Sequence, residues 1–356
     1  METDIIDEQA LSIKWVKGEL HSSLEADAVD PRGLIDGDQS VGAFENFPWF
    51  QRVAKHWQGD WAPIVAHSWH EGAHCWLFLA KTSERETQSL SNWYSFAFRP
   101  LFRGETSPLL LKALAKRLCA TASVSPILTL YPVPRTDGSS DMILKAFRQG
   151  GWFALRHQST TSWTCNVSGK SFDDYWAERP SQMRSTYSRK LKKSGITTEV
   201  HTVFDANHWA EYEAVYESSW KTAEGSPAFL RDMAEHESAQ GGYRLGLARL
   251  DGEVIAAQFW VVHSGTAYIH KLAYREEQRE LSPGTILSVA LSRHVIDIDR
   301  VNSIDFGTGN DRYKADWMDR SDPLDTIRLY KKSSPTALFA VVRAKISALV
   351  HRQSLD

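Results

Sequence analysis

Two stretches of this 356-residue chain show the same order of structural signals, and this repeat constrains the fold more than any other feature. Segments 64–79 and 246–262 each hold two apolar runs around a turn, at Glu71-Gly72 and at Asp251-Gly252. The two turn glycines lie 180 positions apart. Strand-like runs follow at 93–98 and 267–274, and each leads through a polar loop to an apolar helix. We therefore predict two hairpins, each followed by a strand and a helix.

The two predicted helices begin at Ser-Pro steps, Ser107-Pro108 and Ser282-Pro283, which lie 175 positions apart. Serine is expected to cap each helix, and proline fits the first turn because its missing amide would have no intrahelical partner. A further strand follows each helix, over 126–132 and 303–307. Four pairings in the same order indicate an internal duplication. The alternative is that ordinary α+β chains also share hairpins and helices.

The length suits two domains of 150 to 200 residues each. We expect an N-terminal extension over 1–45, in which 27–44 forms turns and loop, a first domain over 46–168 and a second domain over 169–335. A C-terminal helix is expected over 336–356, with apolar Leu338, Phe339, Val342, Ile346 and Leu349 beside basic residues. It is either a packing helix or an amphipathic surface for anionic lipid at the inner membrane.

Composition narrows the classes of partner. The net charge of −3 disfavours a protein that binds nucleic acid through phosphates. Three cysteines without a CxxC pattern, an acidic start without an apolar signal core and no run of about 20 apolar residues predict a cytoplasmic protein. The 14 tryptophans fit cores, an apolar ligand cleft or a membrane-facing surface. Trp209, Tyr212, Tyr216 and Trp220 stand at helical spacing, which is typical of core packing.

Residues 70–74 match the H-E-x-x-H motif of zinc proteases. That motif binds zinc from a helix, where two histidines four positions apart share a face. Here strand-like runs flank it, Gly72 lies inside it and no third ligand is evident, although His67 and Cys75 lie close by. We predict an exposed hairpin turn and assign no metal ligands.

Two features suit phosphate binding. The basic run over 184–193 lies in a predicted helix and is either a solvated face or a surface for a nucleotide-bearing substrate. Ser282, Gly284 and Thr285 lie at a helix start, where backbone amides face an anion. Gly284 permits close approach of a pyrophosphate, whereas Leu109 stands at the matching position of the first copy. The alternative for the second feature is an ordinary helix cap.

The motifs AAQFWVV (256–262), YIHKLAYREE (268–277), LSPGTILS (281–288) and DFGTGNDRYKADW (305–317) together resemble the acetyltransferase domain of CelD-type proteins. These proteins belong to the GNAT superfamily and are related to the FemAB tandem-GNAT transferases; some bacterial ceramide synthases are similar. The resemblance is strongest over 170–330. It implies an α+β, three-layer fold of two tandem GNAT-like domains, each a mixed, mostly antiparallel sheet flanked by helices.

The resemblance also implies a reaction: transfer of an acyl group from an acyl-CoA or acyl-carrier protein thioester to an amine, with no bound cofactor. A long-chain lipid amine such as a sphingoid base is the preferred acceptor because of the aromatic excess. The alternatives are a FemAB-like aminoacyl transferase, an acetyltransferase in exopolysaccharide assembly and a non-catalytic protein with a degenerate site.

The reaction needs groups that deprotonate the amine, polarise the carbonyl and protonate the thiolate. His270 is the first choice for the base, because strand alternation places Tyr268, His270 and Leu272 on one face. The alternative is a hydrogen-bonded core histidine. Asp305 and Asp311 are alternative carboxylates, Tyr313 supplies the proton, and Lys314 binds phosphate or stabilises negative charge. The remaining assignments are Lys271, Ser282, Gly284 and Thr285 to the donor, and Trp220, Lys221, Asp311 and Trp317 to the acceptor.

Overall fold

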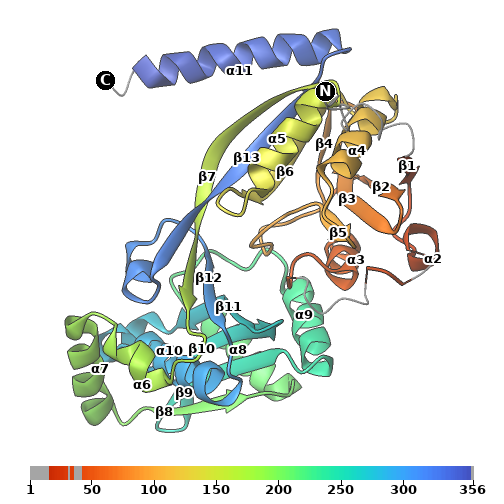
Figure 1. Cartoon of the computed structure of the whole chain (residues 1–356). Coiled ribbons are helices and arrows are strands. Elements are labelled where there is room, and N and C mark those ends of the chain that lie inside the picture. Colours follow the sequence, from red (N-terminus) through yellow and green to blue (C-terminus); the bar gives the residue numbers. More distant parts are fainter. Residues whose placement is uncertain (1–15, 31–32, 36–41, 354–356) are drawn as a thin grey trace, which may run out of the picture. The chain divides into compact units, whose positions relative to one another are not determined.

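The repeat found in the sequence is a repeat of structure. A computed structural model describes residues 16–30, 33–35 and 42–353, so the acidic first 15 residues lie outside the described part. The chain divides into two units: residues up to 160 with those from 323 onward, and residues 161–322 (Figure 1). The chain thus crosses between units at two places, rather than once near residue 168, because its strand at 320–331 pairs within the first unit.

The first unit contains β1 (Lys17–His21), α2 (Ala26–Val29), α3 (Phe47–Lys55), β2 (Ala62–His70), β3 (Ala73–Lys81), β4 (Glu86–Ser89), β5 (Leu101–Arg103), α4 (Pro108–Ala120), β6 (Ile127–Pro134), α5 (Ser139–Gln149), most of β7 (Trp152–Asn166), most of β13 (Arg320–Lys331) and α11 (Pro335–Gln353). Its sheet runs in the order β1-β2-β3-β4-β6-β13. All these pairs are antiparallel except β4 with β6, which are parallel and are connected through α4.

The second unit contains α6 (Phe172–Ala177), α7 (Ser181–Ser194), β8 (Thr197–His201), α8 (Ala206–Glu217), α9 (Pro227–Ala239), β9 (Tyr243–Leu250), β10 (Glu253–His263), β11 (Thr266–Tyr274), η1 (Glu276–Leu281), α10 (Pro283–Arg293), η2 (His294–Ile298), β12 (Ser303–Thr308) and η3 (Arg312–Asp316). Its sheet runs β12-β11-β10-β9-β8, and the end of β7 pairs with β12. Again one pair is parallel: β11 and β12, connected through α10.

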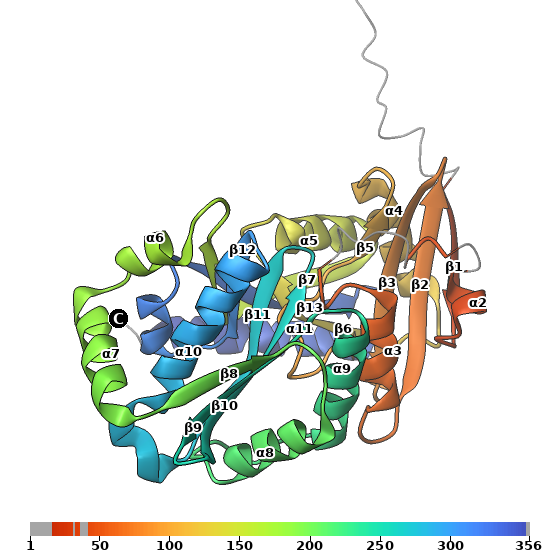
Figure 2. The same ribbon diagram turned by 90° about the horizontal axis from the view of Figure 1, so that it is seen from below.

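Each unit therefore has a hairpin followed by a parallel pair with a crossover helix, which confirms the predicted α+β fold of two similar domains. Helices cover both faces of the second sheet (Figure 2). On β10, Gln258 contacts Ser288 of α10, whereas the next residue, Phe259, packs on Trp209 of α8. Since successive side chains of a strand point to opposite faces, α10 and α8 lie on opposite sides.

Both predicted hairpins are confirmed. Glu71 and Gly72, like Asp251 and Gly252, have positive φ angles of the kind that tight turns require. The H-E-x-x-H motif is thus a strand, a turn and a strand: His70 ends β2 and pairs across the hairpin with Ala73 of β3. This is not the helical geometry of a zinc protease.

The strand predicted at 93–98 is wrong. Instead, the parallel strand of the first unit is β4, a few residues earlier, and 93–98 forms turns and irregular structure. The Asn92 side chain accepts a hydrogen bond from the Tyr94 amide, and the Ser95 hydroxyl accepts one from the Asn92 amide. Such local bonds compete with a ladder, so the aromatic run is buried without forming a strand.

The predicted serine caps are also wrong. Neither Ser107 nor Ser282 accepts a cap hydrogen bond with its side chain, although Pro108 and Pro283 do lie in the first turn as expected. Ser282 instead adopts a left-handed conformation, with φ 56°. Strand β1, within the predicted extension, was not foreseen: it pairs with β2 at the edge of the sheet.

The aromatic residues serve mainly as core. The fully buried side chains include Trp49, Trp76, Trp152, Trp209 and Trp260. Trp209, Tyr212 and Tyr216 confirm the predicted core stripe of α8, whereas Trp220 follows the end of that helix and is 50% exposed.

The predicted C-terminal helix is confirmed as α11, and Ala337 and Val341 are buried on it. Phe339 and Val342 are exposed, and the side chains of Ile346 and Leu349 lie outside the described part. No helix within the described ranges has both the length and the apolar character needed to cross a membrane.

Candidate active site

A cavity of about 490 Å³ lies in the second unit, where β11 and β12 diverge. The two strands pair only from Thr266 to Tyr268 of β11. Beyond Tyr268 they separate, and residues of α10 form part of the wall of the gap. The cavity is lined by Leu272 and Tyr274 of β11, by Gly284, Thr285 and Ser288 of α10, by Phe306 of β12, and by Pro180, Gln182, Met183, Thr186, Trp220, Tyr313, Asp316 and Trp317.

Five of the fourteen residues that line this cavity are aromatic. The rings of Trp220 and Tyr274 lie 4.3 Å apart between centroids, and Tyr313 packs edge-on against Phe306 at 5.7 Å. Trp317 is buried and is held from behind, because its carbonyl accepts hydrogen bonds from the Tyr175 hydroxyl and the Arg179 guanidinium. The cavity therefore suits an apolar group.

The start of α10 is held in place by a buried glutamine of β10. The Gln258 amide donates to the Gly284 carbonyl (3.0 Å) and to the Ser288 hydroxyl (2.8 Å), and its oxygen accepts from the Trp260 indole (2.9 Å). Gln258 is completely buried. The sequence analysis gave it no role, although a glutamine within the apolar run AAQFWVV was a usable signal.

A β-bulge changes the expected orientation of His270. Phe259 of β10 pairs with Lys271, but the next residue, Trp260, pairs with Ile269, so His270 is the extra residue of β11. Its ring lies 5.9 Å from the ring of Phe259, on the α8 side of the sheet.

The prediction that His270 and Leu272 share a face is therefore wrong. Leu272 lines the cavity on the α10 side, together with Tyr274. Strict alternation places both residues on one face, but the bulge interrupts it between them. His270 is buried and is not among the cavity-lining residues. Its role as base stays a prediction.

Three lysines beside the diverging strands have lowered pKa values. Burial, together with the positive charges of Lys271 and Lys314, lowers the pKa of Lys221 to about 8. Burial also lowers the pKa of Lys271. Its ion pair with Glu224, at 2.8 Å, raises the pKa but does not cancel the effect of burial. Lys314 donates to the carbonyls of Phe306 (3.2 Å) and Thr308 (2.7 Å), and burial lowers its pKa as well. Lys221 interacts electrostatically with the other two lysines and with the carboxylates of Asp311 and Glu224. We call the three lysines the lysine cluster.

The pair of Lys271 with Glu224 gives a stability prediction. Both side chains are about nine-tenths buried. Lys271→Met removes one charge and leaves the other desolvated, so we expect the free energy of unfolding to fall by about 3 kcal/mol. The double variant Lys271→Met/Glu224→Leu should recover most of the loss. Urea unfolding followed by circular dichroism measures both, and a loss below about 1 kcal/mol in the single variant would show that the pair is solvated.

Acidic and phenolic groups complete the site. Tyr313 is 45% exposed, and the desolvation of its inner part, with the negative charge of Asp311, raises its pKa to about 12. Asp311 is mostly exposed, with a carboxylate oxygen 3.9 Å from the Lys314 amine. Asp305 accepts a hydrogen bond from the Gly307 amide (2.7 Å) within β12, where the pairing with β7 is irregular between Asp305 and Thr308. Asp316 is exposed and lines the cavity beside Tyr313. The sequence analysis assigned no role to Asp316, although it lies inside DFGTGNDRYKADW.

The structure brings five of the predicted residues to the cavity wall: Trp220, Gly284, Thr285, Tyr313 and Trp317. Seven others do not line it: Lys221, His270, Lys271, Ser282, Asp305, Asp311 and Lys314. Of these, the three lysines form the cluster described above, and Asp311 contacts it.

Residues 181–315 match the family model described as an acetyltransferase (GNAT) domain. Among solved structures, FemX is similar at 12% identity and a TM-score of 0.61, over 92% of this chain and 99% of that chain. A tandem GNAT protein from the clavulanic acid biosynthesis pathway is similar at 11% identity and a TM-score of 0.50, over 88% and 98%.

The C-terminal domain of a putative lysylphosphatidylglycerol synthetase from Agrobacterium fabrum is similar at 13% identity and a TM-score of 0.51, over 76% and 85%. No curated protein matches the sequence. At these identities the solved structures establish the fold alone, and the match over 181–315 adds the class of enzyme for the second unit, a GNAT-type N-acyltransferase.

Proposed function

With the GNAT-type N-acyltransferase domain as the premise, we propose that the second unit transfers an acyl group from acyl-CoA to a primary amine, preferably a long-chain lipid amine. The observation that carries this proposal is the aromatic cavity between β11, α10 and β12, which opens at a helix start with a glycine in its wall. The family supplies the thioester and amine chemistry, and the cavity supplies the preference for apolar groups.

The donor's phosphates have positive partners in the second unit. The first amides of α10 have no intrahelical partner, and the helix dipole places partial positive charge there. Helix α7 contributes Gln182, Met183 and Thr186 to the cavity wall and carries exposed Arg189, Lys192 and Lys193. A pyrophosphate at α10 therefore has a basic helix within the same site. An acyl-carrier protein, whose prosthetic arm carries the same thioester, is the alternative donor.

The reaction forms one C–N bond and breaks one C–S bond. The amine attacks the thioester carbonyl. The lysine cluster does not line the cavity, but from behind its wall it adds a positive field for the developing oxyanion. We assign removal of the amine's proton to Asp316, directly or through one water, because this carboxylate lines the cavity. Tyr313 donates its proton to the departing thiolate. With a pKa of about 12, its hydroxyl keeps that proton at neutral pH.

Tyr313 gives a catalytic prediction. Tyr313→Phe keeps the ring that packs on Phe306 but removes the proton donor. We expect kcat for acyl-CoA to fall by about 100-fold, with KM changed little. Donors with a better leaving thiol need less protonation and should lose less activity. An equal loss with every thiol would mean that Tyr313 acts in binding rather than as the acid.

The proposed function is tested by thiol release from CoA thioesters of increasing acyl length, each with a panel of short and long-chain amines. We expect amine-dependent release that increases with chain length, and highest turnover with a sphingoid base. Turnover of acetyl-CoA alone would remove the lipid version and favour sugar acetylation in exopolysaccharide assembly. No release with any donor would reject the proposal.

A FemAB-like aminoacyl transferase is the second candidate. It is favoured by the fold similarity to FemX over nearly the whole chain and by the exposed basic residues of α7. The net charge of −3 counts against a tRNA donor. Aminoacyl-tRNA incubated with the enzyme and the same amine panel separates the candidates, since peptide-bond formation requires the tRNA ester only in this second case.

A further inference from the structure

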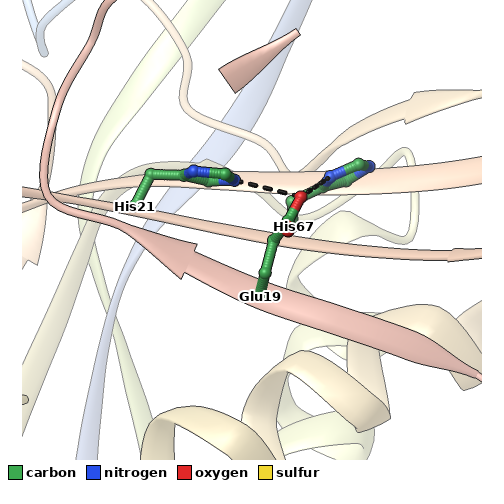
Figure 3. Close-up of side chains that lie close together, drawn as sticks. All are labelled: Glu19, His21 and His67. Atoms are coloured by element: carbon green, nitrogen blue, oxygen red, sulfur yellow. Dashed lines mark hydrogen bonds and ion pairs between the residues drawn. The ribbon is translucent and has the colours of Figure 1, made fainter. Parts of the chain in front are cut away.

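Three potential metal ligands meet at the edge of the first unit's sheet. Glu19 and His21 come from β1, and His67 comes from β2 directly opposite Glu19 in the antiparallel register. Figure 3 shows the two imidazole rings approaching the Glu19 carboxylate from opposite sides. Glu19 and His21 are two positions apart on one strand, so their side chains share a face.

The distances suit a small divalent cation. A Glu19 carboxylate oxygen lies 3.2 Å from His21 Nε2 and 3.3 Å from His67 Nδ1, and the three ligand atoms all lie within 4.8 Å of one another. Ligand atoms bound tetrahedrally to zinc at 2.0 to 2.1 Å are about 3.3 Å apart. Two of the three separations therefore already match, and a small movement of the exposed Glu19 side chain is enough to admit the ion.

The imidazole ring of His67 is fixed in orientation by its neighbours, as is typical of a metal ligand. Its ring is stacked on Trp76 at 4.3 Å and on Trp69 at 4.7 Å between centroids, so its orientation is fixed. Its second nitrogen, Nε2, lies 3.0 Å from His74 Nδ1. A hydrogen bond at the second nitrogen fixes the tautomer of a metal-bound histidine.

We propose that Glu19, His21 and His67 form a zinc site that fastens the edge strand β1 to β2. Two imidazoles and one carboxylate are a ligand set that zinc takes in proteins, with water completing the tetrahedron. Glu19 is 45% exposed, so solvent can supply that water. Zinc needs the lone pairs of His21 Nε2 and His67 Nδ1, so each bound ring carries its proton on the other nitrogen. For His67 that nitrogen is Nε2, which then donates to His74 Nδ1.

This site gives a role to the histidines of the β2–β3 hairpin, whereas the zinc-protease motif does not. The second histidine of that motif, His74, supports His67 from behind rather than binding metal together with His70. The additional ligands come from β1, a segment without a strand signal in the sequence.

The test is metal binding by the full chain purified without a histidine tag and treated with EDTA. Isothermal titration with Zn²⁺ should show one tight site, and saturating Zn²⁺ should raise Tm by about 5 °C, whereas Mg²⁺ should do neither. Co²⁺ should give the visible absorption bands of a tetrahedral site.

Glu19→Gln and His21→Ala should each lower Zn²⁺ affinity at least about 10-fold and remove the Co²⁺ bands. Neither residue is fully buried, so the metal-free Tm should change little. The matched control is His201→Ala, because His201 also lies on a strand with a carboxylate oxygen 3.2 Å away but is not among the three clustered ligands. It should bind like the wild type. Unchanged Zn²⁺ binding in Glu19→Gln and His21→Ala, or no binding by the wild type, would overturn the proposal.

Discussion

Asp316→Asn is expected to lower kcat/KM for acyl transfer by about 100-fold without loss of folded protein. A positioned general base contributes 10²-fold to 10⁴-fold, and an amide of the same shape cannot accept the amine's proton. Asp316 is exposed, so its replacement should change stability by less than about 0.5 kcal/mol. Steady-state kinetics with the best acyl-CoA and amine pair, together with thermal unfolding, measures both effects.

Two variants make this result specific. Asp173→Asn changes a carboxylate of α6 whose side chain is 82% exposed, and it should retain wild-type activity. His270→Ala should lose less than about fivefold, because the bulge turns this ring toward Phe259 and away from the cavity wall. The opposite pattern, with activity kept in Asp316→Asn and lost in His270→Ala, would assign the base to His270.

Gly284→Val is expected to lower kcat/KM for the acyl donor by at least about 100-fold. A Cβ at this position would lie 3.2 Å from the Tyr274 ring, and the two methyl groups of valine would extend into the cavity at the start of α10. The bulk displaces the donor where its phosphates and thioester must approach the backbone, and such misplacement costs about 10²-fold.

Gly284→Ala is the graded control. Its Cβ would also lie 3.2 Å from the Tyr274 ring, so that ring must shift slightly, and the preference of alanine over glycine in a helix, about 1 kcal/mol, offsets the cost. The smaller side chain should cost about tenfold in donor kcat/KM. A loss that appears as raised donor KM, with the amine's KM unchanged, places the donor at α10. Wild-type kinetics in Gly284→Val would remove the donor from this cavity.

Much of the fold could be predicted from local patterns. The two Asp/Glu-Gly turns between apolar runs, the Ser-Pro helix starts and their near-equal offsets describe hairpins and crossover helices that the structure confirms. The prediction of a strand at 93–98 was wrong because local hydrogen bonds around Asn92 outweigh the high strand propensity of these residues. Strand β1 was not predicted because its five residues carry no strand signal of their own. They form a strand through their pairing with β2.

The site was harder to predict for one physical reason. The orientation of side chains on β11 depends on the register of β10 and β11, and a single extra residue at His270 reverses it. Nothing in YIHKLAY indicates that bulge. The cavity-lining Asp316 and the buried Gln258 were visible as polar residues in the motifs, but only the structure shows where each one points.

Detection of the amide product tests the central claim most directly. Wild-type enzyme is incubated with an isotope-labelled long-chain acyl-CoA and a long-chain primary amine, and the products are analysed by mass spectrometry beside Gly284→Val. We predict a labelled amide in amounts equal to the CoA released by the wild type, and almost none from Gly284→Val. CoA release without amide, or the same amide yield from both proteins, would contradict acyl transfer in this cavity.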